Sequence, residues 1–283
     1  MKTIKIAGVP EHFNLPWQLC IESGEFEEIG IDLQWINVPE GTGKMCQMLR
    51  DNETDIAVIL TEGIVKDIVA GNDCSIVQVY VESPLIWGIH VAANSKYNAL
   101  DDLENTKVAI SRYGSGSHLM AYVNAQNQNW NTENLQFEIV NTIEGAVEAL
   151  TAGSADYFMW ERFMTKPLVD NGIFRRVADC PTPWPCFVIV VRNAFLEANT
   201  QSVALLLETI NNTTAEFRDI PSIDRTLASR YNLKLDDVKE WLSLTNWSQK
   251  PLVEKVLNNI QNQLFDLKII DKKGTFAKIV KAV

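Results

Sequence analysis

The stretch Asp55-Ile56-Ala57-Val58-Ile59-Leu60 decides the fold class. After one acidic residue it is apolar throughout and short, which is typical of a strand buried on both faces of a sheet. A helical pattern precedes it at 43–52, where Met45, Met48 and Leu49 share one face, and another follows at 62–70. A doubly buried strand between two helices indicates an α/β sheet covered by helices on both sides.

The same order of elements occurs twice. In the first copy, strand patterns at 4–8, 31–38 and 55–60 alternate with helical patterns at 17–26, 43–52 and 62–70. In the second copy, about a hundred residues later, strand patterns at 107–111, 137–141 and 156–160 alternate with helical patterns at 116–127, 144–152 and 161–169. Segments 52–57 and 152–157 play matching parts, each ending a helix and starting a buried strand. This alternation predicts two Rossmann-like lobes with parallel sheets.

Two proline-interrupted segments, 75–93 and 173–192, are rich in strand-forming residues and connect the lobes. Two such crossings predict two hinge strands, an arrangement that permits closure around a ligand. We therefore expect lobe 1 to comprise 1–87 and 190–283, and lobe 2 to comprise 88–189. Residues 193–283 contain amphipathic helical patterns and form a helical C-terminal region that we place against lobe 1.

Composition excludes several classes of protein. The 283 residues carry a net charge of −11, which argues against a nucleic-acid partner. No apolar stretch approaches the roughly 18 residues of a membrane span, and the chain starts directly with a strand pattern. We expect a cytoplasmic protein if Met1 is the true start, and a periplasmic or outer-surface one if a leader has been removed.

The cysteines and histidines predict neither a disulfide framework nor a metal site. Five scattered cysteines contain no C-x-x-C, and free thiols are expected, although Cys180 and Cys186 are close enough in sequence to pair. The three histidines lack metal-ligand spacing. No Walker loop or dinucleotide fingerprint occurs, so no cofactor is expected.

Ligands of open α/β sheets bind beyond the carboxyl ends of the strands, which selects the loops at 9–17, 39–43, 61–63, 112–118, 142 and 160–162. The most informative is Tyr113-Gly114-Ser115-Gly116-Ser117-His118, which follows a strand and opens a helix. Its glycines allow close backbone approach, and its amides and hydroxyls are donors for an acceptor group. A plain helix cap is the alternative interpretation.

Aromatic and acidic residues gather in the same loops. Aromatic faces with a few polar groups suit a small organic ligand. Glu11 and Glu161 are candidates to meet an amine or ring N–H, whereas Glu40 and Glu62 are expected at a solvated rim or as N-terminal helix charges that the helix dipole stabilises. The expected ligand-binding residues are Glu11, His12, Phe13, Trp17, Thr42, Thr61, Tyr113, Gly114, Ser115, Gly116, Ser117, His118, Trp160, Glu161 and Trp184.

The chain resembles the type II periplasmic binding proteins, in particular the nitrate/sulfonate/taurine and thiamine-precursor group. The resemblance rests on the strand from Asp55, on Gly114–His118, on Trp160-Glu161, and on the strand 188–192 followed by Phe195-Leu196-Glu197. It implies ligand contacts at 12–17, Thr42, Thr61, 115–118 and 160–161. It departs from the family at Arg162, where many members have proline.

The resemblance also implies a function. Members of that group capture a solute and deliver it to an ABC permease in the membrane, so we expect a binding protein and not an enzyme, and we expect this chain to be a monomer. The expected ligand is a small organic molecule such as a sulfonate, an amino compound or a thiamine-pyrimidine-like compound. The alternative is an enzyme of the same fold that acts on a thiamine-pyrimidine or menaquinone precursor, with His12 and Glu11 or His118 and Ser117 as acid–base pairs. A regulator's effector domain is disfavoured, because no helix-turn-helix fits before the first strand.

Overall fold

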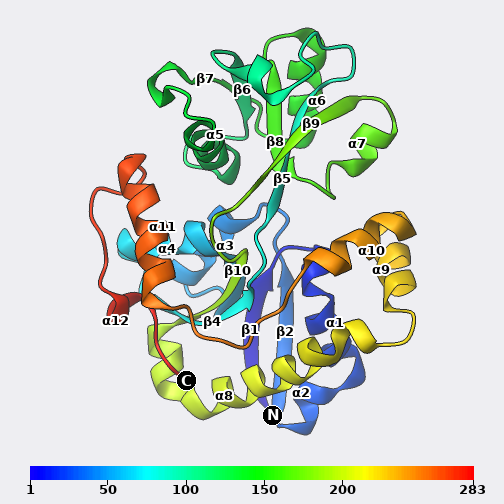
Figure 1. The fold of residues 1–283 in the computed structure, drawn as a ribbon. Helices are drawn as coiled ribbons and strands as arrows, with labels where there is room; N and C mark the ends of the chain where they lie inside the picture. Colours follow the sequence, from blue (N-terminus) through cyan, green and yellow to red (C-terminus); the bar gives the residue numbers. More distant parts are fainter. The chain divides into compact units, whose positions relative to one another are not determined.

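Strands and helices alternate as expected and build one five-stranded sheet in each of two lobes (Figure 1). The computed structural model describes all residues from Met1 to Val283. Lobe 1 comprises Met1–Ser83 and Trp184–Val283, and lobe 2 comprises Pro84–Pro183. These limits differ by four and six residues from the expected ones, because the paired part of each crossing strand lies wholly inside one lobe.

The sheet of lobe 1 has the order β2-β1-β3-β10-β4. Its strands are β1 (Lys2–Gly8), β2 (Ile31–Asn37), β3 (Ile56–Leu60), β4 (Cys74–Val81) and β10 (Phe187–Arg192). β1 pairs in parallel with β2 and β3, whereas β10 runs antiparallel to both β3 and β4. The prediction of parallel sheets is therefore wrong at β10, which follows the crossing from lobe 2 and runs in the opposite direction, and it is wrong in the same way at one strand of lobe 2.

The sheet of lobe 2 repeats this arrangement with the order β7-β6-β8-β5-β9. Its strands are β5 (Ile86–Ala92), β6 (Lys107–Ile110), β7 (Gln136–Ile139), β8 (Tyr157–Glu161) and β9 (Phe174–Pro181). β6 is parallel to β7 and β8, and β5 is antiparallel to β8 and β9. In each lobe the strand in the fourth position is thus the one that arrives from the other lobe.

The helices of lobe 1 cover both faces of its sheet. α1 (Leu15–Ser23) connects β1 to β2, whereas α3 (Thr42–Arg50) and α4 (Thr61–Val69) lead in the opposite direction along the sheet. Because such crossovers are right-handed, α1 lies on one face and α3 with α4 on the other. The short α2 (Glu25–Glu28) packs beside β2.

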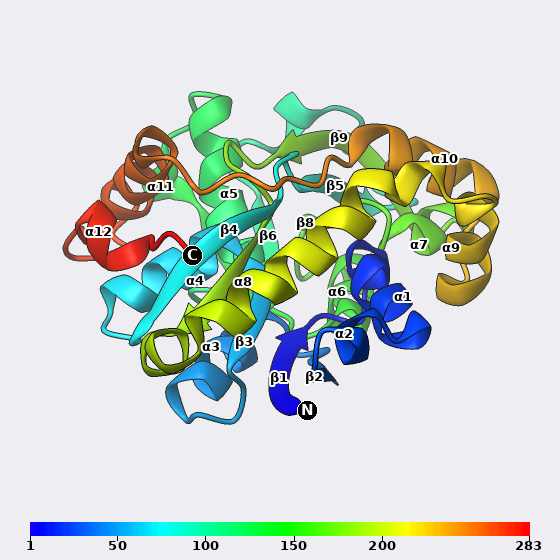
Figure 2. The ribbon, with the colours of Figure 1, turned by 90° about the horizontal axis from the view of Figure 1, so that it is seen from below.

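The C-terminal region is helical and belongs to lobe 1. It contains α8 (Asn193–Glu216), α9 (Ile223–Tyr231), α10 (Leu235–Leu244), α11 (Glu254–Asp266) and α12 (Phe276–Ile279). Figure 2 shows α8 running across the strands on the side of α1, and α11 and α12 beside α4. Placement of this region in lobe 1 agrees with the expectation from the sequence.

Lobe 2 has three helices of its own, α5 (Gly116–Asn127), α6 (Ile143–Ala152) and α7 (Lys166–Asp170). Beneath α6 lies a buried apolar cluster that includes Ala109, Leu150, Phe158 and Phe174. The helix expected at 161–169 begins only at Lys166, because the residues after Glu161 form a turn closed by Thr165.

One acidic residue fixes the start of the third strand in each lobe. The Asp55 carboxylate accepts the amide of Lys5 at 3.0 Å, and the Asp156 carboxylate accepts the amide of Lys107 at 2.8 Å. Asp55 also forms a 2.7 Å ion pair with Arg192 at the end of β10. Segments 52–57 and 152–157, which were expected to play matching parts, therefore contain the same hydrogen bond, in which an aspartate carboxylate accepts a backbone amide.

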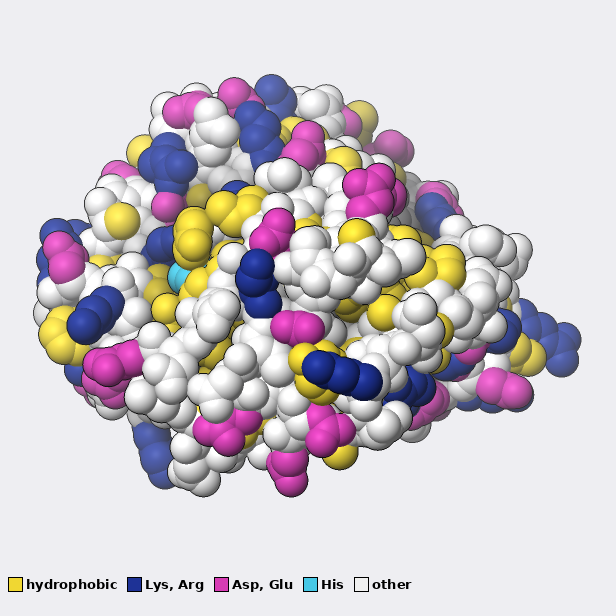
Figure 3. All heavy atoms as spheres, turned by 90° about the horizontal axis from the view of Figure 1, so that it is seen from above, with side chains coloured by type: hydrophobic (Ala, Val, Ile, Leu, Met, Phe, Trp, Pro, Cys, Tyr) yellow, Lys and Arg dark blue, Asp and Glu magenta, His cyan; other side chains and the backbone are white.

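The remaining surface and thiol features are simple. All five cysteines are free and buried, as expected, including Cys180 and Cys186. Acidic and basic side chains are interspersed over the face seen in Figure 3. No helix combines the length and apolar character needed to span a bilayer.

The hydrogen bond and the ion pair made by Asp55, which we call the Asp55 clamp, lead to a prediction about stability. Asp55→Ala removes a backbone acceptor and an ion pair that is largely shielded from water, so we expect about 2–3 kcal/mol of destabilisation in urea unfolding. Asp156→Ala removes only the backbone acceptor and is expected to cost about 1–2 kcal/mol. The exposed neighbour Asp51→Ala is the control, with an effect within about 0.5 kcal/mol. Equal losses for Asp55→Ala and Asp51→Ala would show that the clamp does not stabilise lobe 1.

Candidate functional site

In lobe 1 the candidate site is the edge of the sheet where β1 and β3 end. Because β10 is antiparallel, it begins at this same edge, with Phe187 opposite Leu60. The Phe13 ring from the loop after β1 lies 5.2 Å from the Phe187 ring, centroid to centroid. The edge therefore joins residues 11–13, the start of α4 and the segment that leads into β10.

The start of α4 holds that segment through several hydrogen bonds. The Thr61 hydroxyl donates to the Pro185 carbonyl at 2.6 Å, and the Trp184 indole N–H donates to the Glu62 carboxylate at 2.8 Å. Glu62 is only 4% exposed. Burial raises the pKa of Glu62 from 4.5 to about 7, although hydrogen bonds from its own backbone amide and from Trp184 oppose this shift. Glu62 lies in the first turn of α4, as one of the two expectations had it. The other expectation, a solvated rim position, is wrong, because the sequence did not reveal that Trp184 returns to contact Glu62.

The loop after β1 presents one carboxyl group and buries its histidine. Glu11 is partly exposed, yet surrounding protein atoms desolvate its carboxylate and raise its pKa to about 7. His12 is buried against Phe13 and Trp241, with ring centroids 4.9 and 4.3 Å away, and its Nε2 has no partner. Burial lowers the pKa of His12 to about 3. His12 is thus a neutral core residue, which removes the basis for a Glu11–His12 acid–base pair.

Two more residues of lobe 1 that were expected to bind the ligand are Trp17 and Thr42. Trp17 is fully buried among Phe26, Trp35 and Tyr80, so its assignment to the ligand site is corrected to the core. Thr42 is partly exposed, and its methyl group covers Gly63, where a Cβ atom would approach to 2.3 Å.

In lobe 2 the corresponding edge is organised by the start of α5. Ser115 is the N-cap, and its hydroxyl accepts the His118 amide at 3.3 Å. The Ser115 and Ser117 hydroxyls are 3.1 Å apart, and Ser117 accepts the Ser111 amide at 2.9 Å. Ser115 is therefore a helix cap, and both Ser115 and Ser117 are buried. The two hydroxyls also form a short chain of donors at a helix N-terminus, where partial positive charge favours an acceptor.

Residues 113–118 also form an aromatic and imidazole surface. Gly114 has a φ of 76°, and its amide donates to His118 Nδ1 at 3.1 Å, which places the proton of a neutral ring on Nε2. Tyr113 is 62% exposed and contacts the His118 ring edge-on. The structure thus groups Tyr113, Gly114 and His118 on one rim.

A buried tryptophan completes the lobe 2 edge. Trp87 lies opposite Glu161 in the β5–β8 pairing, and its ring lies so close to Gly116 that a Cβ atom there would be 2.9 Å away. The Trp160 ring packs on Trp87 at 6.1 Å, and the buried Trp87 indole N–H has no partner. Trp87 is not among the expected ligand-binding residues, and it reaches this edge because β5 is antiparallel to β8.

Glu161 is held in a turn at the end of β8. It is 6% exposed and accepts the Met164 amide at 2.7 Å. Below it the Thr165 hydroxyl bonds the Glu161 carbonyl at 3.0 Å and the buried His90 Nε2 at 3.0 Å. No group of three or more His, Cys, Asp or Glu side chains is arranged to hold a metal ion.

Known proteins share this fold. Residues 87–180 match the family described as Ca3427-like PBP, where PBP denotes periplasmic binding protein. No curated protein matches in sequence. The structure of the Candida albicans CA3427 gene product, described as having the generic periplasmic binding protein fold, is 24% identical with a TM-score of 0.87, covering 97% of this chain and 92% of that one.

Two solved sulfonate-binding proteins are also similar. The alkanesulfonate-binding protein SsuA from Xanthomonas axonopodis pv. citri, bound to MOPS, has a TM-score of 0.83 at 17% identity, covering 100% of this chain and 99% of that one. The periplasmic aliphatic sulphonate binding protein SsuA from Escherichia coli has a TM-score of 0.79 at 18% identity, covering 99% and 92%. The resemblance stated from the sequence is confirmed: the fold is that of the type II periplasmic binding proteins.

The buried Glu62 predicts a pH dependence of stability. The unfolded chain ionises Glu62 near pH 4.5, whereas the folded chain keeps it protonated up to about pH 7. The stability associated with Glu62 is therefore complete below pH 4.5 and is lost as the pH rises through 7. Glu62→Gln removes this loss and keeps an acceptor for Trp184, so its stability relative to the parent protein should rise by up to about 3 kcal/mol between pH 4.5 and 8.

Urea unfolding at several pH values measures this difference. Glu40→Gln, at an exposed position in the loop before α3, is the matched control and should change stability equally at every pH. Parallel pH profiles for the parent protein and Glu62→Gln would contradict the assignment of Glu62 as a buried, protonated acid.

Proposed function

We propose that this chain, which has the type II periplasmic binding protein fold, reversibly captures a small organic ligand with residues from both lobes. The observation that carries the proposal is that each lobe has the same construction at the carboxyl ends of its strands. A helix N-terminus there meets a tryptophan from a crossing segment, Glu62 with Trp184 in lobe 1 and Gly116 with Trp87 in lobe 2. The two crossings would then act as hinges.

Lobe 2 would bind the acceptor end of the ligand. The Ser115 and Ser117 hydroxyls lie at the start of the twelve-residue helix α5, where the helix dipole favours negative charge. The unpartnered Trp87 indole N–H adds a donor beside Gly116. Oxygen atoms of a sulfonate or carboxylate match such donors. Tyr113 and Trp160 would contact the apolar part.

Lobe 1 would bind the opposite end of the ligand. Glu11 and Glu62 have pKa values raised to about 7, so at neutral pH each is only partly ionised. An amine or ring N–H close to either carboxyl would favour its ionised form and gain a charge-assisted hydrogen bond. A ligand that carries both an acceptor group and a nitrogen, such as an aminoalkane sulfonate, fits this division better than a simple inorganic anion.

The biological role that we propose is delivery of the ligand to an ABC permease by a monomeric binding protein, on the outer side of the membrane. The similar SsuA structures, named for alkanesulfonate and aliphatic sulphonate binding, support a sulfonate as the first ligand class to test. The amino-compound and thiamine-pyrimidine classes remain the next candidates.

A thermal-shift screen tests this function. Sulfonates, nitrate, amino acids and aminopyrimidines are added to the protein, and an organic compound with both groups is expected to raise Tm by an amount that increases with its concentration relative to Kd. Ser115→Ala combined with Trp160→Ala should weaken binding of that compound at least about tenfold, because a donor and an aromatic contact are removed.

The matched control is Ser154→Ala combined with Trp130→Ala, which makes the same changes near the opposite edge of lobe 2, where β7 and β8 begin. It should bind the compound as the parent protein does. Unchanged binding by the Ser115/Trp160 variant would place the pocket elsewhere. Turnover of a compound without stabilisation by any would favour the enzyme alternative.

A further inference from the structure

The C-terminal region carries a charge opposite to that of the rest of the chain. Residues 250–283 contain seven lysines and three acidic residues, a net charge of +4, within a protein whose net charge is −11. Such an asymmetry is often the electrostatic mark of an interaction with an anion. Several of these lysines surround one cavity in lobe 1.

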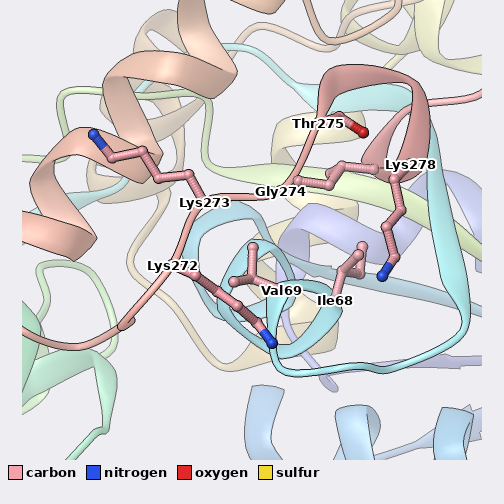
Figure 4. A pocket seen from close by; sticks show the side chains of 8 residues that line it. Ile68, Val69, Lys272, Lys273, Gly274, Thr275 and Lys278 are labelled. Carbon is pink, nitrogen blue, oxygen red and sulfur yellow. The ribbon is translucent and has the colours of Figure 1, made fainter.

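The cavity lies between the end of α4 and the loop that leads into α12 (Figure 4). Its volume is about 290 Å³, close to the lower limit for small-ligand pockets. Its residues divide into an apolar group and a basic loop; they are Ile68, Val69, Lys272, Lys273, Gly274, Thr275, Lys278 and Ile279.

The loop over the cavity has a defined conformation. The buried Gln261 side chain binds Gly274 twice, accepting its amide at 2.6 Å and donating to its carbonyl at 3.2 Å. A Cβ atom at Gly274 would approach Ile279 to 2.8 Å, so the loop packs as closely on the apolar residues as glycine permits. These contacts fix the chain at Gly274, between Lys272 and Lys278, and at Ile279 next to Lys278.

The three lysines have different environments. The Lys273 ammonium already has partners, because it donates a hydrogen bond to Asn262 at 2.7 Å and lies 4.9 Å from the Phe265 ring centroid. Figure 4 shows it directed away from the side chains of Ile68 and Val69, with Lys272 and Lys278 on either side of those two. Lys272 and Lys278 are exposed, and neither ammonium has a carboxylate partner.

We propose that this cavity is a second binding site, separate from the carboxyl edges of the sheets, for a phosphate monoester with a small apolar group. Two unpaired ammonium groups favour a dianion over a monoanion, and a phosphate monoester is mostly dianionic above its second pKa of about 6. The apolar side chains of Ile68, Val69 and Ile279 provide a surface for the attached group.

Titration calorimetry of the full chain with phenyl phosphate and with inorganic phosphate tests the proposal. Phenyl phosphate is expected to bind with a stoichiometry of one and more tightly than inorganic phosphate, since only the former contacts the apolar residues. Lys272→Gln combined with Lys278→Gln should weaken phenyl phosphate binding at least about tenfold. Raising the salt concentration from 0.05 to 0.5 M should also weaken it, because exposed charges are screened.

The control is Lys255→Gln combined with Lys268→Gln, which removes the same charge from exposed positions outside the cavity and should retain affinity within about twofold. Equal losses in both double variants would reduce the effect to net charge and overturn the site. Loss of binding in Ser115→Ala with Ser117→Ala, together with retention in the Lys272/Lys278 variant, would assign phenyl phosphate to the lobe 2 edge instead.

Two further outcomes would also overturn the proposal. One is the absence of measurable binding of phenyl phosphate at millimolar concentration. The other is a fall in Tm of the Lys272/Lys278 variant without any change in binding, which would mean that these lysines only stabilise the C-terminal end of α4.

Discussion

Each sheet depends on one antiparallel strand that arrives from the other lobe. β10 lies between β3 and β4, and β5 lies between β8 and β9, so neither sheet is continuous without its return strand. The Asp55–Arg192 ion pair fixes the far end of β10 to the turn that starts β3. Because each of these strands is central, it pairs with a neighbour on both sides, and both neighbours belong to its own lobe. The continuity of each sheet therefore depends on the strand that follows a crossing segment, and all strands of each sheet lie within their own lobe.

The same return strands determine what lies at the candidate site. An antiparallel strand begins at the edge where parallel strands end, and this brings Trp184 to α4 and Trp87 to α5. Each tryptophan then shields polar groups at a helix N-terminus from water. In lobe 1 burial raises the pKa of Glu62, which the hydrogen bond from Trp184 partly opposes, and in lobe 2 the buried Trp87 indole N–H has no partner. The direction of the return strands therefore determines both which residues meet at the site and which of their polar groups are buried.

The basic cavity at α12 differs from the sheet edges in both position and composition. It lies in the helical region that packs beside α4, and it is lined by lysines whose positive charge is opposite to the net charge of the remaining chain. A site at the sheet edges uses buried hydroxyls, indoles and carboxyl groups, whereas the cavity uses exposed ammonium groups over an apolar surface. The two kinds of site are therefore expected to differ in salt dependence, since only exposed charges are strongly screened.

The sequence by itself determined the alternation of elements, the two lobes, the helical C-terminal region and the loops at the strand ends, because hydrophobic periodicity and glycine-serine helix starts are local signals. Glu11, Ser115, Ser117 and Trp160 could be named as candidates from those signals alone. Only the tertiary structure decided that Trp17 and His12 are core residues, that Glu62 is buried by Trp184, and that Trp87 reaches the start of α5. Those outcomes depend on strand direction and on contacts between residues up to about 230 positions apart, such as His12 with Trp241. Periodicity along the chain carries no record of which distant segment will cover a given side chain.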